Sequence, residues 1–118
     1  VPILLPHQLD IEASFVGVSK AGSLLGCGAL KRLEPGHGEI KSMRTADAAL
    51  GRGVGKAMLD HIVDTARQSG IARISLETGS TKQFAAANRL YEKEGFDRTG
   101  PFGGYAETGF TRFFTKEI

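Results

Sequence analysis

The chain has 118 residues, the length of one compact domain, and its 41% hydrophobic and 24% charged residues are typical of a globular protein. Its 15 basic and 13 acidic residues are interspersed, so no basic stripe of the kind that binds DNA or RNA is present in the sequence. No apolar run approaches the roughly 20 residues that span a bilayer. We therefore expect neither nucleic acid nor a membrane as a partner.

Cysteine and histidine residues are few. Cys27 is single and cannot form an internal disulfide, which fits a reducing cytoplasm. His7, His37 and His61 lie far apart, and no Cys or His pair has the spacing of a zinc site. We expect no metal, and we interpret Cys27 as a small apolar residue of a strand.

The amino-terminal residues predict a loop followed by a hairpin. Residues 1–13 contain Pro2 and Pro6 and show no period, which indicates a loop or a remnant of something longer. Residues 14–19 and 23–32 are strand-like and are separated by a short turn with glycine. This pattern is typical of a β-hairpin.

A third strand is expected over residues 37–45, after a turn that contains Pro35 and Gly36. Its side chains alternate between two sets, which are Glu39, Lys41 and Met43 on one face and Ile40, Ser42 and Arg44 on the other. The first part of the chain thus predicts three antiparallel strands in succession.

The period then changes from two to about four. Residues 52–69 predict an amphipathic helix that ends at Gly70, a residue suited to the left-handed position after a helix. Its apolar face consists of Val54, Met58, Leu59, Ile62, Val63 and Ala66. A strand over residues 72–78 follows, and such a strand–helix–strand unit normally has parallel strands.

The last part of the chain predicts a second helix and two closing strands. The helix covers residues 81–94 and stops at Gly95, and the strands cover residues 96–99 and 109–115. The fold class is therefore α/β with a mixed sheet, in a single domain over residues 1–118. The phenylalanines Phe110, Phe113 and Phe114 of the last strand could pack in a homodimer as readily as in the core.

A glycine-rich segment precedes the first helix. Gly51, Gly53 and Gly55 let the backbone turn tightly and approach a ligand, and the first turn of a helix presents unpaired N–H groups to a phosphate. Arg52 and Lys56 add positive charge. We expect a pyrophosphate to bind here.

Two common phosphate-binding motifs do not fit this segment. A nucleoside-triphosphate loop would need glycine where Leu50 stands and a hydroxyl residue where Ala57 follows the lysine. A dinucleotide loop would need a glycine at Lys56 or Met58.

The glycine segment, the antiparallel strands before it and the later run Leu90-Tyr91-Glu92-Lys93-Glu94-Gly95-Phe96 together resemble the GNAT acetyltransferases. The resemblance covers about residues 14–116. Three features depart from the family pattern: Leu50 replaces the usual Gln or Arg, Phe84 replaces an asparagine that many members have, and the family's first strand and amino-terminal helices are mostly absent.

The resemblance implies the GNAT acyltransferase fold and acetyl-CoA as cofactor. The backbone of Met43–Thr45 would pair with pantetheine like an added strand, beside a point where two parallel strands splay. The residues expected to contact the cofactor are Met43, Arg44, Thr45, Leu50, Gly51, Arg52, Gly53, Val54, Gly55, Lys56, Phe84, Asn88 and Tyr91.

The resemblance also implies that the acetyl group is transferred to a primary amine, by direct attack of the amine in a ternary complex. We expect this amine to be a small molecule. Tyr91 matches the family tyrosine that donates a proton to the leaving sulfur, and a base must take the ammonium proton. Glu77 is the favoured base and Glu39 its rival. The alternative, from another class of function, is a non-catalytic module that binds CoA or has a regulatory role.

Overall fold

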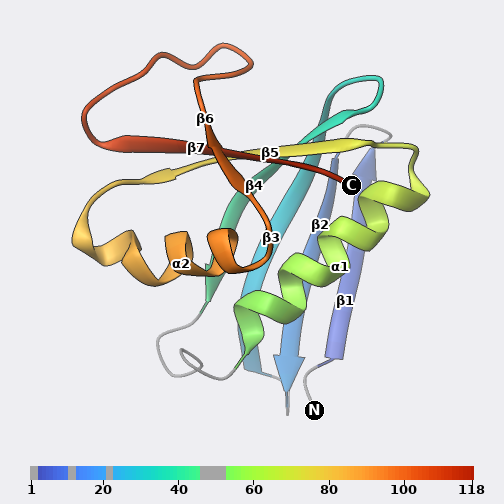
Figure 1. Cartoon of the computed structure of the whole chain (residues 1–118). Coiled ribbons are helices and arrows are strands. Elements are labelled where there is room, and N and C mark those ends of the chain that lie inside the picture. Colours follow the sequence, from blue (N-terminus) through green and yellow to red (C-terminus); the bar gives the residue numbers. More distant parts are fainter. Residues whose placement is uncertain (1–2, 11–12, 21–22, 46–52) are drawn as a thin grey trace.

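The computed structural model describes residues 3–10, 13–20, 23–45 and 53–118 of the chain. Within these ranges the strands form one seven-stranded sheet, and two α-helices pack on it (Figure 1). The strands are β1 (Ile3–Asp10), β2 (Ala13–Lys20), β3 (Ser23–Glu34), β4 (His37–Thr45), β5 (Arg73–Gly79), β6 (Asp97–Thr99) and β7 (Thr111–Glu117). The helices are α1 (Val54–Gln68), the 3-10 turn η2 (Lys82–Phe84) and α2 (Ala85–Lys93).

The sheet has the order β1-β2-β3-β4-β5-β7-β6. Strands β1 to β4 pair antiparallel in chain order, β4 and β5 are parallel across the α1 connection, and β7 lies between β5 and β6. The predicted α/β class with a mixed sheet is confirmed, as are the hairpin, the third strand and the parallel strand–helix–strand unit.

The prediction of a loop over residues 1–13 is wrong, because Ile3–Asp10 forms strand β1 and pairs with β2. Pro6 indicated a loop because proline has no N–H for a ladder. An edge strand tolerates the missing N–H on the side where it has no neighbouring strand, and β1 is an edge strand of this sheet. A strand therefore precedes the hairpin, although the comparison with the family pattern led us to expect the first strand to be mostly absent. Among the described residues, no helix precedes α1.

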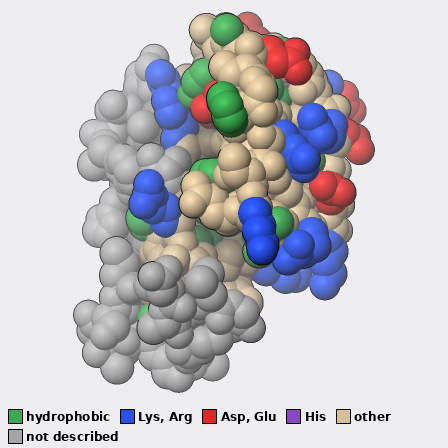
Figure 2. Space-filling model, turned by 90° about the vertical axis from the view of Figure 1, so that its left-hand side faces the viewer, with side chains coloured by type: hydrophobic (Ala, Val, Ile, Leu, Met, Phe, Trp, Pro, Cys, Tyr) green, Lys and Arg blue, Asp and Glu red, His purple; other side chains and the backbone are tan. Residues whose placement is uncertain are grey.

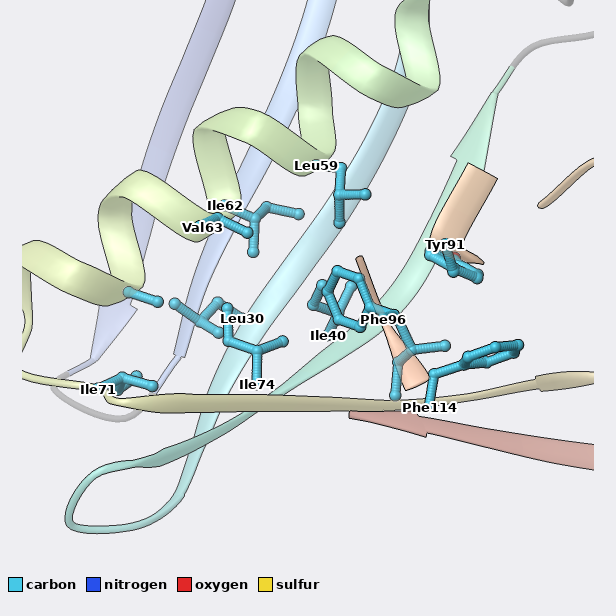
Figure 3. Packing of buried hydrophobic residues seen from close by; sticks show 12 residues of the cluster. Leu30, Ile40, Leu59, Ile62, Val63, Ile71, Ile74, Tyr91, Phe96 and Phe114 are labelled. Atoms are coloured by element: carbon cyan, nitrogen blue, oxygen red, sulfur yellow. The ribbon is translucent and has the colours of Figure 1, made fainter. Parts of the chain in front are cut away.

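One core lies between the sheet and the two helices. Leu59, Ile62 and Val63 of α1 point toward the sheet residues, and Tyr91 of α2 and Phe114 of β7 close the far end of the cluster (Figure 3). Every residue of the predicted apolar face of α1 is buried. Gly70 and Gly95, which follow the two helices, have positive φ angles of 80° and 91°, as their positions predicted.

On the other face of the sheet, the segment between β6 and β7 packs over part of β4 and β7. Its Phe102 and Tyr105 pack against Phe113 of β7, with ring centroids 5.7 and 6.0 Å from that ring. Phe113 and Phe114 are buried, on opposite faces of β7, whereas Phe110 is 74% exposed. The predicted homodimer contact therefore depends on Phe110 alone and stays a prediction.

Neither of the helices that the structure describes combines the length and the apolar character needed to cross a membrane.

Candidate active site

The two central strands separate in the middle of the sheet. Strands β4 and β5 pair in parallel from His37 and Arg73 to Ile40 and Leu76, and the pairing ends there. Strand β4 continues to Thr45, while β5 continues to Gly79 in a full ladder with β7. The splay expected from the family resemblance is therefore present, and cavities open on both sides of it.

A β-bulge accompanies the splay. Cys27 pairs with Arg44 and Ala29 with Lys41, so β4 has one more residue than β3 between these pairs. The extra residue changes the face to which the following side chains point, and Met43 joins the apolar core. The predicted alternation, with Met43 on the face of Glu39, is wrong for this reason.

The first cavity, of about 360 Å³, lies between the end of β4, the start of α1 and α2. It is lined by Met43, Arg44, Thr45, Gly53, Val54, Gly55, Lys56, Gln83, Ala86, Ala87, Leu90 and Tyr91. Seven of the residues expected to bind the cofactor are thus gathered around it together with Tyr91. Leu50, Gly51 and Arg52 lie outside the described residues.

The amino terminus of α1 has the features of a phosphate site. Gly53 precedes the helix with a φ of 78°, in the left-handed region, and no side chain of the described residues caps the first turn. Its N–H groups are therefore left for another acceptor. A Cβ on Gly55 would lie 3.2 Å from Cδ2 of Leu90, so a larger residue would fill the space beside these groups. These features fit a pyrophosphate.

Positive charge borders this cavity. Lys56 donates to Asp60 at 2.8 Å and to Glu94 at 3.3 Å, and these hydrogen bonds raise its pKa. Figure 2, which looks onto the side where α2 begins, shows lysine and arginine side chains over the middle of the surface. Lys56 has two carboxylate partners, whereas Arg44 has no ion pair within the described residues. The positive charge of Arg44 is therefore the less neutralised of the two.

Phe84 and Asn88 are placed differently from the other predicted cofactor residues. Phe84 lines the second cavity, and its ring lies over Gly79. Asn88 is buried, lines neither cavity and donates from Nδ2 to the Gly79 carbonyl at 3.0 Å. Its Oδ1 has no partner among the described residues. Asn88 thereby attaches α2 to the end of β5.

The second cavity, of about 260 Å³, lies on the other side of the splay. It is lined by Glu39, Ile40, Lys41, Met43, Arg44, Leu76, Glu77, Thr78, Phe84, Ala87, Tyr91 and Tyr105. Both candidate bases, Glu39 and Glu77, are therefore brought to one cavity, together with the candidate acid Tyr91.

Glu39 and Glu77 differ in their surroundings. Glu39 is 3% exposed, and its Oε2 accepts a hydrogen bond of 2.6 Å from the Tyr105 hydroxyl. Glu77 is exposed, and its side chain has no hydrogen bond or ion pair among the described residues. Tyr105 was not among the site residues predicted from the sequence. In the sequence Tyr105 is an isolated tyrosine in a glycine-rich segment. This segment has no hydrophobic period, so the sequence does not indicate which residue Tyr105 contacts.

Tyr91 stands between the cavities and lines both. It is 5% exposed, and burial raises the pKa of its hydroxyl, which keeps it protonated at neutral pH. Its ring packs against Phe96 and Phe114 at centroid distances of 5.9 and 5.8 Å. A buried tyrosine held by its ring, with a protonated hydroxyl between two cavities, is suited to donate a proton there.

A mixed sheet whose parallel strands splay beside the start of a helix is the arrangement that the resemblance to the GNAT acyltransferases implied. The model of the Acetyltransferase (GNAT) family matches residues 4–96. YsnE of Bacillus subtilis, named an uncharacterized N-acetyltransferase, is 46% identical over 107 residues, which cover 91% of this chain and 71% of YsnE. YedL of Escherichia coli, with the same description, is 41% identical over 118 residues, covering 95% of this chain and 74% of YedL.

A solved structure of a GNAT family acetyltransferase from Elizabethkingia anophelis with acetyl-CoA bound has the same fold. Its TM-score is 0.82 at 16% identity, over 99% of this chain and 98% of that one. The chain belongs to the GNAT acetyltransferase family, and the prediction of an acetyl-CoA-dependent acetyltransferase is confirmed at the level of that family.

Proposed function

We propose that this chain transfers the acetyl group of acetyl-CoA to a primary amine by direct attack in a ternary complex. The observation that carries the proposal is the position of Tyr91 between a cavity beside the α1 terminus and a cavity that holds two glutamates. This arrangement supports cofactor and amine entering from opposite sides of the splay. A small-molecule amine suits the modest size of the second cavity.

The residues of the first cavity bind and orient the cofactor. The uncapped N–H groups at the start of α1 take the pyrophosphate, and the backbone of Met43–Thr45, unpaired with β5, takes the amide groups of the pantetheine arm. When bound, acetyl-CoA supplies the thioester carbonyl that the amine attacks and the sulfur that leaves. Tyr91 donates its hydroxyl proton to that sulfur.

A carboxylate of the second cavity takes the proton from the ammonium group. The sequence favoured Glu77, but the structure leads us to propose Glu39. Glu39 is buried and is held by a hydrogen bond, whereas Glu77 is exposed and solvated. A fixed, partly desolvated base transfers protons more effectively than a mobile one. Glu77 then attracts the cationic amine to the cavity.

Release of free thiol from acetyl-CoA in the presence of a panel of primary amines tests this function. We expect release with at least one small amine and a matching acetylated product. CoA binding without thiol release for any amine, including protein amino termini, would favour the non-catalytic CoA-binding or regulatory module instead. The single Cys27 is in keeping with a reaction in the cytoplasm.

A further inference from the structure

Tyr105 contacts the proposed base from a distant part of the chain. It belongs to the segment between β6 and β7, and its hydroxyl donates to Glu39 Oε2 at 2.6 Å, a short hydrogen bond of the kind that charged acceptors form. Among the described residues the Glu39 side chain has no other hydrogen-bond partner, so its second oxygen remains for the amine. Tyr105 also lines the cavity itself.

The ring of Tyr105 is held independently of any ligand. Its centroid lies 5.4 Å from that of Phe102 and 6.0 Å from that of Phe113, and the Phe102 ring also packs against His37 at 6.1 Å. His37 in turn hydrogen-bonds to Ser75 of β5 at 2.7 Å. The hydroxyl therefore occupies a position set by packing on β4, β5 and β7.

The hydrogen bond to Glu39 raises the pKa of Tyr105 to about 12, with smaller contributions from burial and from the charges of Glu39 and Glu77. Tyr105 thus stays a neutral donor throughout the range in which an amine would be acetylated. Other titratable groups also surround Glu39. They are Lys31 opposite it on β3, His37, Lys41 and Arg44 on β4, Glu77 on β5, and Tyr91 on α2.

We propose that Tyr105 is the positioning residue of this enzyme: its hydroxyl holds the Glu39 carboxylate in one orientation, so the β6–β7 segment completes the base. The inference rests on the proposed function and assigns Tyr105 no contact with the reacting atoms. A role confined to packing would be filled equally well by phenylalanine.

The first test compares Tyr105→Phe with wild type in kcat and in KM for the amine. The variant keeps the ring contacts but removes the donor, so Glu39 loses its fixed orientation. We expect kcat to fall roughly tenfold, a part of the 10²–10⁴-fold that general acid–base catalysis supplies, while KM stays near that of wild type. Phe110→Leu, on the same segment but exposed, should leave both constants unchanged.

The second test needs no acetyl transfer. The chain has two tyrosines and no tryptophan, so in a Tyr91→Phe background the phenolate absorbance reports Tyr105 alone. Tyr105 should titrate near 12, and adding Glu39→Gln should bring its pKa down toward the ordinary value of about 10. An unchanged titration in the Glu39→Gln protein would overturn the contact on which the inference depends.

The two tests separate the proposals. A wild-type enzyme that transfers no acetyl to any amine would refute the proposed function and with it the role of Tyr105 in catalysis. A Tyr105→Phe enzyme with the kcat of wild type would refute the positioning role alone.

Discussion

Ile40 and Leu76 form the last pair of the parallel ladder between β4 and β5, and both side chains are buried in the core beneath it. Beyond this pair the β5-facing side of β4 has backbone groups without β5 partners. The core thus fixes where the opening starts, and the start of α1 lies beside the same opening. We therefore expect binding of the cofactor to depend on the end of β4 and on the first turn of α1 together.

Gly55→Val should weaken CoA binding while leaving the protein folded. A Cβ at this position meets Leu90 at 3.2 Å, so the β-branched side chain is forced into the cavity beside the first-turn N–H groups. Loss of one hydrogen bond to a charged group costs about 1.5–3 kcal/mol, or about tenfold or more in affinity. Titration calorimetry with CoA measures the change, and circular dichroism checks the fold.

Gly100→Val is the matched control, because a Cβ at Gly100 would have no atom within 4 Å and this residue lines neither cavity. Its CoA affinity should equal that of wild type. Unchanged affinity in a folded Gly55→Val protein would contradict the assignment of the pyrophosphate site.

Phe114→Ala should destabilise the fold strongly, and Phe110→Ala should not. Phe114 is fully buried in the apolar cluster, where removal of an aromatic side chain costs about 3–5 kcal/mol. Phe110 is 74% exposed, so its truncation should change the free energy of unfolding by within about 0.5 kcal/mol. Urea unfolding of both variants tests this contrast. A large cost at Phe110 would indicate that this ring is covered in solution, as in the predicted homodimer.

Elements with a strong period could be predicted from the sequence. The apolar face of α1 and the two glycine stops follow from local spacing, and the structure has them where expected. Strand β1 was missed because Pro6 is a local loop signal, whereas its tolerance depends on the position of the strand at the sheet edge. The bulge before Arg44 was missed because the sequence alone does not show that β4 has one more residue than β3 at this point. A regular alternation of side chains was therefore expected there.

The candidate site could be predicted only in part, for the same physical reason. Motifs in α1 and α2 indicated the cofactor side, since each is local in sequence. The difference between Glu39 and Glu77 depends on burial by the β6–β7 segment and on a hydrogen bond between Tyr105 and Glu39, which are 66 residues apart. Long-range contacts of this kind have no periodic signal.

The stability of the protein at alkaline pH should depend on Tyr105. Its pKa rises from about 10 in the unfolded chain to about 12 in the fold, so its stabilising contribution is complete below pH 10 and is lost as pH rises through 12. The difference in unfolding free energy between wild type and Tyr105→Phe should therefore be constant below pH 10 and narrow above it. Urea unfolding across this range measures the difference; a gap that stays constant would contradict the raised pKa.

Tyr91→Phe should separate chemistry from binding. The variant keeps the ring packed against Phe96 and Phe114 but removes the acid, so kcat should fall roughly 10²–10⁴-fold while CoA affinity stays near wild type. Steady-state kinetics and calorimetry on the same preparation measure both quantities. Near-full turnover in a folded variant would leave Tyr91 as a packing residue between the cavities.

The two glutamates are distinguished by matched glutamine variants. Glu39→Gln removes the proposed base with little change in shape, so kcat/KM near neutral pH should fall by the roughly 10²–10⁴-fold expected for general acid–base catalysis. The loss should shrink as pH rises, because more of the amine is then already unprotonated. Glu77→Gln should act mainly through KM, since an exposed carboxylate attracts the cationic amine without taking its proton, and its effect should weaken as salt screens the attraction. If instead Glu77→Gln abolishes turnover at neutral pH and Glu39→Gln leaves the pH profile unchanged, Glu77 is the base and the bond from Tyr105 serves the fold alone.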